Sequence, residues 1–430
     1  MKEIYETTAF EQIENFEQYQ RYKSIKNQFS YCYKGIDLIK AIALDLLGII
    51  VCGEKRTIRH IGYNLLRRLD TDNLITAFKR NKAVFSHDYP DRKDHVELAT
   101  LIQQEIENAE LVFLKYHFKY WFNPILFIKN FFIVAKQIKG ISLFNKLYLA
   151  ARLVYFSRMT DALSKAFQNV NLQDKIYVPF SSCAYNETLL TLFFNQKSVK
   201  TFHIFHGFYG KFRQKISTDI IARENILANT ILAFSETLKN DLITDFGIDA
   251  ARIFVAGHPK YPEKKISTHP TFKSCIILSG MKIYDEYLEA LLILLNEISC
   301  ELQIQFYLKP HPHSDIINSS VLKKCKNIFL LDKTETLKHI FSSGKYDCAI
   351  THNTSSYFDS MYYNIIPLRW GIEENMDFEG FDDKFYDMES FKKLIVKYQQ
   401  MDKEELNNKI SSLLKKSCGV GINKYKELIK

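Results

Sequence analysis

Apolar and polar positions alternate differently in the two parts of the chain. Over residues 1–110 apolar side chains recur at helical spacing, as at Leu65, Leu66 and Leu69, and a mainly helical structure is predicted up to residue 170. From residue 175 onward, short apolar runs alternate with helix-length segments. This alternation is typical of βαβ units with parallel strands.

The predicted strands fall into two groups separated by a polar stretch. The runs KIYVPF, KTFHIF, TILAF and RIFVA begin at residues 175, 200, 230 and 252. Residues 261–272, rich in Pro and Lys, are predicted to form a linker. Further strands are expected at residues 274–278, 303–308, 327–331, 346–350 and 365–369, followed by a helical tail over 390–430. The predicted domains are therefore 1–260 (helical over 1–170, α/β over 175–260) and 273–430.

Two α/β halves joined by a linker predict two Rossmann-like domains with a largely helical N-terminal extension. In such sheets the loops at the carboxyl ends of the strands bind ligands. We expect these loops to face inward, so that the two domains face each other across a ligand cleft.

Composition narrows the class of protein. Apolar residues make up 47% and charged residues 25% of the chain, which is typical of globular proteins and excludes collagen-like repeats. No stretch of eighteen residues lacks a charge, and the eight cysteines form no CxxC pair. The beginning of the chain has no apolar signal region. We expect a cytoplasmic protein with no bound metal and no cofactor.

The segment from Leu111 to Thr160 has an unusual charge pattern. It contains eight Lys and Arg and no Asp or Glu, so its charge of +8 nearly equals the +9 of the whole chain. Basic residues interleaved with aromatic ones are typical of helices that lie on anionic lipid. The segment predicts peripheral contact with the inner face of the plasma membrane. A pair of buried helices with snorkelling lysines, or the basic wall of a substrate cleft, is the alternative. No nucleic-acid-binding motif accompanies the charge.

Two segments of the second half carry candidate chemistry. The first is Lys309-Pro310-His311-Pro312, directly after an apolar strand. The prolines restrict the backbone as it leaves the sheet, so His311 is held in a defined direction. Its imidazole can donate to a phosphate oxygen, and Lys309 adds a positive charge. The alternative is a structural turn with an exposed histidine.

The second segment is Thr354-Ser355-Ser356, which follows the strand YDCAI at the predicted start of a helix. Hydroxyl groups at this position cap the helix and add donors beside free backbone N–H groups. Such a group of donors binds one phosphate or carboxylate without a metal. A helix cap needs only one of these hydroxyls. The chain also lacks the motifs GxGxxG, GxxxxGK[ST], HExxH and GxSxG, which argues against the enzymes that depend on them.

The order KPHP, strand, then T-S-S opening a helix resembles the C-terminal half of bacterial GT-B glycosyltransferases that use cytidine-nucleotide donors. These include sialyltransferases, polysialyltransferases and the capsular Kdo transferases. The resemblance covers residues 175–370 and implies an acceptor-side domain over 1–260 and a donor-nucleotide domain over 273–430. It implies an inverting, metal-independent transfer of a sialic acid-like or Kdo-like sugar from a CMP donor. The acceptor would be a surface glycan or a lipid-linked glycan.

The resemblance also implies roles for individual residues on the donor side. His311 would contact the donor phosphate, with Lys309 and Pro312 in the same loop. Thr354, Ser355 and Ser356 would hold the phosphate or the carboxylate of the sugar. The loop of Ser279 and Gly280, after the first strand of the second half, would lie close to the nucleotide.

The catalytic base is expected in the first half. His206, followed by Gly207, matches the His-Gly found at a strand end in several of these families, and a histidine suits proton transfer near neutral pH. A structural histidine is the alternative there. His203, Glu187 and Asp88 are further candidates for the base.

Other functions also fit these residues. Transfer of CDP-glycerol or CDP-ribitol is an alternative within the transferases, and a GT-B-type nucleotide-sugar epimerase is an alternative enzyme. A non-catalytic, membrane-associated scaffold is the alternative outside enzymes.

Overall fold

A computed structural model of the chain describes residues 10–88, 91, 93–118, 123–184, 186–205, 211–212, 222–280, 285–311, 314–352, 354–371, 376–377 and 382–430. These residues form two compact units. The first unit comprises the described residues up to 205, residues 222–260 and residues 421–430. The second unit comprises residues 211–212 and the described residues between 261 and 420.

The first unit contains a six-stranded sheet in which every pairing is parallel. Its order is β11-β10-β8-β7-β4-β5, so the chain adds β5 on one side of β4 and all later strands on the other side. The direction of winding therefore reverses between β4 and β7. The strands are β4 (Ala83–His87), β5 (Ala109–Phe113), β7 (Ile176–Pro179), β8 (Lys200–Ile204), β10 (Thr230–Ala233) and β11 (Ile253–Val255).

Two of these strands correct the prediction of a helical N-terminal part. β4 and β5 lie within residues 1–170, where a mainly helical structure was expected. Their sequences, AVFSH and AELVF, are short apolar runs that periodicity cannot distinguish from buried helical turns. The sheet of the first unit therefore begins at Ala83.

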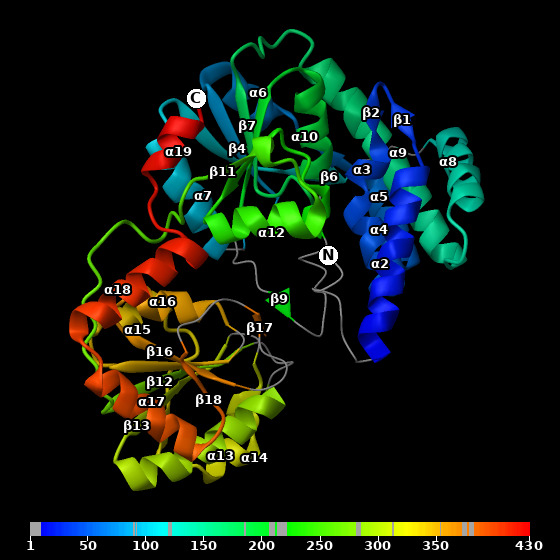
Figure 1. Cartoon of the computed structure of the whole chain (residues 1–430). Helices are drawn as coiled ribbons and strands as arrows, with labels where there is room; N and C mark the ends of the chain where they lie inside the picture. Colours follow the sequence, from blue (N-terminus) through cyan, green and yellow to red (C-terminus); the bar gives the residue numbers. More distant parts are fainter. Residues whose placement is uncertain are drawn as a thin grey trace. The chain divides into compact units, whose positions relative to one another are not determined.

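Helices surround this sheet and form a layer beside it (Figure 1). Two short antiparallel pairs, β1 (Cys32–Tyr33) with β2 (Ile36–Asp37) and β3 (Arg67–Leu69) with β6 (Tyr116–Phe118), accompany them. The helices are α2 (Phe10–Gln28), α3 (Leu38–Ala41), α4 (Ala43–Ile50), α5 (Ile58–Leu66), α6 (Asp72–Arg80), α7 (Lys93–Glu105), α8 (Pro124–Gln137), α9 (Leu143–Ala166), α10 (Glu187–Gln196), α12 (Glu236–Phe246) and α19 (Asn423–Leu428).

Helix α9 forms part of the core of the first unit. Nearly every side chain from Tyr148 to Thr160 is buried. Arg152 is only 8% exposed, and its Nε donates to the carboxylate of Asp45 on α4 at 3.0 Å. Membrane contact through residues 148–160 of the basic aromatic segment is therefore wrong. The alternative of buried helices holds for this part of α9.

The second unit contains a second six-stranded parallel sheet, in the order β14-β13-β12-β15-β16-β18. This is the Rossmann order, in which the winding reverses between the first and fourth strands, here β12 and β15. All five strands expected after residue 273 are present. The strands are β12 (Ser274–Leu278), β13 (Gln305–Lys309), β14 (Ile328–Leu330), β15 (Cys348–Thr351), β16 (Ile366–Trp370) and β18 (Lys384–Phe385).

The helices of the second unit are α13 (Asp285–Leu302), α14 (Ser320–Lys324), α15 (Leu337–Ser342), α16 (Ser356–Tyr362), α17 (Met388–Gln400) and α18 (Lys403–Leu413). A short pair of strands, β9 (Lys211–Phe212) and β17 (Met376–Asp377), is also part of this unit. The end of the chain differs from the expected helical tail of the second domain. Helix α19 belongs to the first unit, where the hydroxyl of Tyr425 donates to the carbonyl of Gly257 at 3.0 Å.

A buried ion pair holds the edge strand β18 in the second sheet. Asp383, which is fully buried, accepts from Nε of Arg369 at 3.0 Å and from its Nη2 at 2.7 Å. The backbone N–H of Arg369 also donates to the carbonyl of Asp383 at 2.9 Å. The pair therefore joins the end of β16 to the start of β18 by both side chains and backbone.

We expect Asp383→Ala to destabilise the second unit strongly, because it leaves the buried Arg369 charge without its carboxylate. Loss of one partner of such a pair costs about 3–5 kcal/mol. Urea denaturation measures the change. Glu389→Ala is the control, since its ion pair with Lys393 is exposed on α17 and is worth about 0.3–0.5 kcal/mol. If both substitutions lowered the free energy of unfolding equally, the stabilising role of the Asp383–Arg369 pair would be contradicted.

Candidate functional site

The predicted donor-binding residues gather at one edge of the second sheet. In the register of the parallel strands, Leu278 at the end of β12 lies opposite both Lys309 on β13 and Thr351 on β15. The three strands therefore end at the same level, and their loops leave the same edge. His311 follows β13 and Ser355 follows β15, so one strand separates them, a distance of about 10 Å at the usual strand spacing.

This edge includes the point where the winding of the sheet reverses. The loops after β12 and β15 lie on either side of the reversal, and open α/β sheets bind ligands in the crevice that forms there. His311 is partly exposed and Ser355 is exposed. Neither side chain is enclosed in the core, so both lie where a ligand at this edge could reach them.

The hydroxyl of Ser279 joins the loop after β12 to the loop after β13. Its Oγ accepts a hydrogen bond from the backbone N–H of His311 at 2.6 Å. The same Oγ donates to the carbonyl of Lys309 at 3.4 Å, and the backbone N–H of Ser279 reaches that carbonyl at 3.3 Å. Ser279 and Gly280 are buried. The backbone that carries the His311 ring is thus fixed to the neighbouring strand.

Lys309 lies at the same edge but is engaged with the protein. It is 7% exposed, and its Nζ donates to the carbonyl of Lys333 at 2.7 Å. Desolvation lowers the pKa of its ammonium group, while the nearby carboxylates of Asp332 and Glu335 oppose that shift. In this conformation Lys309 connects β13 to the segment after β14.

Thr354, Ser355 and Ser356 present hydroxyl groups on the other side of β12. Oγ1 of Thr354 accepts from the backbone N–H of Ser356 at 3.3 Å and donates to its Oγ at 3.2 Å. Ser355 occupies the N-cap position of α16, yet its side chain makes no capping hydrogen bond. The predicted cap is therefore made by Thr354, and the hydroxyl of Ser355 is not used for it.

His352, two residues before Thr354, is buried at the end of β15. It is 3% exposed and packs edge-on against the rings of Tyr287 and Trp370, at centroid distances of 5.8 and 5.7 Å. Burial lowers its pKa to about 4, so the ring is neutral at physiological pH. The sequence alone gave His352 no role. Its position directly after a buried strand is the only signal that could have indicated one.

His206, Gly207 and Pro312 lie outside the described residues. The role of His206 as the base and the place of Pro312 in the donor loop therefore stay predictions. The further candidates His203 and Glu187 are described, and both lie in the interior of the first unit.

The reversal point of the first sheet lies between β4 and β7 and carries two carboxyl groups. Asp88, after β4, accepts from the hydroxyl of Tyr116 at 2.5 Å and from Nδ2 of Asn186 at 2.9 Å, and Nη2 of Arg67 lies 3.8 Å away. The side chain of Asp88 is only 3% exposed. Tyr116, Asn186 and Arg67 were not indicated by the sequence, because they come from three distant elements.

Glu187 opens α10 beside Asp88 and is fully buried. Its Oε1 accepts from Oγ of Ser86 at 2.5 Å and from the backbone N–H of Phe180 at 3.0 Å. Burial, reinforced by the negative charge of Asp88, raises the pKa of Glu187 well above its usual value. Its hydrogen bond from the Phe180 N–H holds the start of the loop after β7.

His203, near the end of β8, also acts on that loop. Its Nδ1 lies 3.0 Å from Oγ of Ser182 and accepts from the Ser182 backbone N–H at 3.4 Å. Burial, together with the positive charges of Arg223 and Arg252, lowers the pKa of His203 to about 3. A ring that is neutral, 2% exposed and engaged in this way is a structural histidine.

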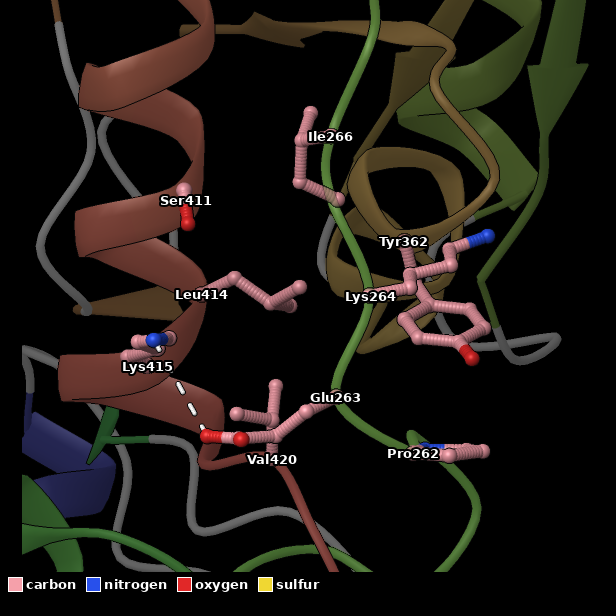
Figure 2. A pocket seen from close by; sticks show the side chains of 9 residues that line it. All are labelled: Pro262, Glu263, Lys264, Ile266, Tyr362, Ser411, Leu414, Lys415 and Val420. Carbon is pink, nitrogen blue, oxygen red and sulfur yellow. Dashed lines mark ion pairs between the residues drawn. The ribbon is translucent and has the colours of Figure 1, made fainter.

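A cavity of about 290 Å³ lies elsewhere in the second unit. Figure 2 shows Lys264 beside the ring of Tyr362, with Glu263 paired to Lys415 across the opening at 3.9 Å. Tyr362 is the last residue of α16, whereas Ser356 is the first, a rise of about 9 Å along the helix. None of the predicted site residues lines this cavity.

Comparison with known proteins gives similarity in fold. No family model and no curated protein sequence matches the chain. A UDP-GlcNAc 2-epimerase from Methanocaldococcus jannaschii, solved with UDP-GlcNAc and UDP, is 11% identical with a TM-score of 0.44, covering 81% of this chain and 97% of its own. The UDP-GlcNAc 2-epimerase from Neisseria meningitidis, bound to UDP-GlcNAc, gives the same values. A glycotransferase of kitacinnamycin is 11% identical with a TM-score of 0.45, covering 81% and 98%.

The expected pair of Rossmann-like α/β units is confirmed by the two six-stranded parallel sheets. None of the three proteins named above is described with a cytidine nucleotide. At this identity and these TM-scores the similarity assigns no activity. None of the helices in the described ranges combines the length and the hydrophobicity that a membrane-spanning segment needs. In the same residues no group of three or more His, Cys, Asp and Glu is placed to hold a metal ion.

The buried acid predicts a pH dependence of the first unit. Because the pKa of Glu187 is raised in the folded chain, its contribution to stability is complete below the unfolded value of about 4.3 and is lost as the pH rises toward the folded value. Glu187→Gln keeps the shape and stays neutral. We expect the variant to gain stability relative to the parent chain as the pH rises from ~4 to ~7.

Hydrogen exchange of the amides of β7, followed across this pH range, measures the effect. Glu236→Gln is the control, because Glu236 occupies the same first helical position on α12 and is exposed. The raised pKa of Glu187 would be contradicted if the stability difference between Glu187→Gln and the parent chain were the same at every pH.

Proposed function

We propose that this chain is a nucleotide-sugar-dependent enzyme that binds the phosphate of its donor at the carboxyl edge of the second sheet. The proposal rests on one observation: His311 and three hydroxyl groups are held on either side of β12 at that edge. Ser279 holds the His311 backbone beside β12, and the hydroxyls of Thr354, Ser355 and Ser356 lie across the reversal point. These are neutral or weakly basic hydrogen-bond donors, which suit an anion.

The proposed roles follow from these positions. The His311 imidazole donates to an oxygen of the donor phosphate from one side. The Ser355 hydroxyl, exposed and not used in capping, donates from the other side. Gly280 has no side chain, so a ligand can approach the backbone there closely. Hydrogen bonds aimed at the phosphate stabilise the charge that develops as it leaves.

The reaction that we propose first is transfer of an acidic sugar from a CMP donor. The acceptor hydroxyl attacks the anomeric carbon in line, the bond from that carbon to the phosphate oxygen breaks, and CMP leaves with the electron pair. A base accepts the hydroxyl proton, and His206 is the proposed group. The configuration at the anomeric carbon is inverted. A lipid-linked acceptor would place this chemistry at a membrane surface.

Epimerisation of a nucleotide sugar at the same edge is the second candidate. It agrees with the UDP-GlcNAc 2-epimerases among the proteins of similar fold. It needs the phosphate site but no acceptor. Transfer of CDP-glycerol or CDP-ribitol uses the same site with a different leaving group. A scaffold without activity would need no nucleotide at all.

A thermal-shift screen with CMP, CDP, UDP and GDP tests the proposal, because a ligand that binds only the folded chain raises its Tm. A response to CMP supports the sugar transferase, and a response to CDP supports polyol-phosphate transfer. A response to UDP, with C2 interconversion of a UDP-sugar in the absence of any acceptor, supports the epimerase. If none of the four nucleotides raises the Tm, the nucleotide site is wrong.

His311→Ala should weaken binding of the responding nucleotide by about 10- to 100-fold, the usual value of a hydrogen bond to a charged group. The bond to Ser279 uses the backbone N–H, so alanine retains it and the fold is preserved. Isothermal titration calorimetry measures the change. His339→Ala is the control, since this histidine is on α15 of the same unit with its side chain 78% exposed. Unchanged affinity in His311→Ala would remove His311 from the site.

A further inference from the structure

Helix α8 of the first unit turns large apolar side chains outward. Ile125 is 80%, Ile128 54% and Phe132 66% exposed. Their spacing of three and four residues places them along one face of the helix. Two more apolar residues, Leu143 and Phe144 at the start of α9, are 60% and 51% exposed. We call these five residues the apolar face.

The opposite side of α8 shows that this orientation is fixed by the fold. Asn130 and Val134 are completely buried, and the amide oxygen of Asn130 accepts from the hydroxyl of Tyr31 at 2.7 Å. An amphipathic surface helix normally buries its apolar stripe and exposes polar residues. In α8 a polar side chain is anchored in the interior while isoleucine and phenylalanine face outward.

The charged residues of α8 and of the first part of α9 are all basic. Lys129 and Lys136 lie on the exposed surface of α8, and Lys139 is exposed just after it. No Asp or Glu occurs between residues 123 and 160. Among the described residues, none of the three lysines takes part in an ion pair. In Figure 1, α8 lies at the outer edge of the helical layer of the first unit.

We infer that α8 and the start of α9 form a binding surface for anionic lipid bilayers. The inferred occupant is a bilayer because apolar rings and lysines here share one surface. In an interfacial helix the rings enter the acyl boundary while the ammonium groups reach the lipid phosphates. A helix of fourteen residues spans about 21 Å, less than the ~30 Å of a hydrocarbon core. It therefore lies in the membrane surface.

The inference does not depend on nucleotide binding and goes beyond the proposed function. It also narrows the membrane contact expected from the sequence. The contact surface runs from Ile125 to Phe144, and the buried part of α9 has no share in it.

Sedimentation of the full chain with vesicles tests the inference. We expect binding to vesicles of phosphatidylcholine mixed with phosphatidylserine, and much weaker binding to pure phosphatidylcholine. Each lysine near such a surface is worth about a fivefold change in affinity. Replacing Lys129, Lys136 and Lys139 together by Gln should therefore weaken binding by about 100-fold.

The apolar contribution is tested separately. Ile128→Ser combined with Phe132→Ser should also reduce binding to the mixed vesicles. Since both side chains are more than half exposed, the thermal transition of the chain should be unchanged. Both sets of substitutions leave the candidate donor site intact, so nucleotide binding should persist in them even where vesicle binding is lost.

The matched control replaces Lys323, Lys324 and Lys326 by Gln. These lysines are exposed in the second unit, and the change in net charge is the same. Control binding equal to that of the parent chain supports a specific surface. The inference is overturned if both triple variants lose binding equally, or if the parent chain binds neither kind of vesicle. A third outcome would also overturn the inference: the parent chain does not bind vesicles but self-associates, and the double variant Ile128→Ser with Phe132→Ser does not. That result would show that the apolar face is an interface between copies of the chain.

Discussion

The level ends of three parallel strands are the constraint on which the candidate site depends. β12, β13 and β15 end together because their backbone hydrogen bonds fix the register. The Ser279 hydroxyl then holds the departing loop of β13 against the departing loop of β12. Without that register, His311 and Ser355 would be residues of two unrelated loops. With that register, their hydrogen-bonding side chains belong to loops on either side of one strand.

The two sheets carry different chemical groups at the points where their winding reverses. In the second unit the groups at this point are hydroxyls and an imidazole near the surface, which suit an anion. In the first unit the corresponding place holds Asp88 and Glu187, both buried, with Arg67 and Tyr116 against the Asp88 carboxylate. Burial and the negative charge of Asp88 raise the pKa of Glu187, which disfavours two negative charges side by side in a low-dielectric interior. The side chains at the reversal point of the first sheet are therefore engaged with one another, and they stabilise the loops around them.

The helical layer shows how one pattern can have two outcomes. Helices α8 and α9 have similar compositions, because both are apolar, aromatic and basic without acidic residues up to residue 160. α9 packs into the core and satisfies Arg152 with Asp45, whereas α8 buries one face in the core and leaves its lysines exposed on the other. The same composition thus supplies core in one helix and a charged apolar surface in the next.

The sequence by itself determined the alternation of strands and helices after residue 175, because apolar runs bounded by Gly, Pro and polar turns specify strands locally. It also indicated which loops carry donors, since KPHP and the three hydroxyls follow such runs directly. Only the tertiary structure decided that β4 and β5 are strands, that Lys309 is engaged by the carbonyl of Lys333, and that the Asp88 network assembles from distant elements. It also decided which face of α8 is buried. The reason is physical: burial and hydrogen-bond partners depend on neighbours brought together by long-range packing, and a local pattern of residues does not contain them.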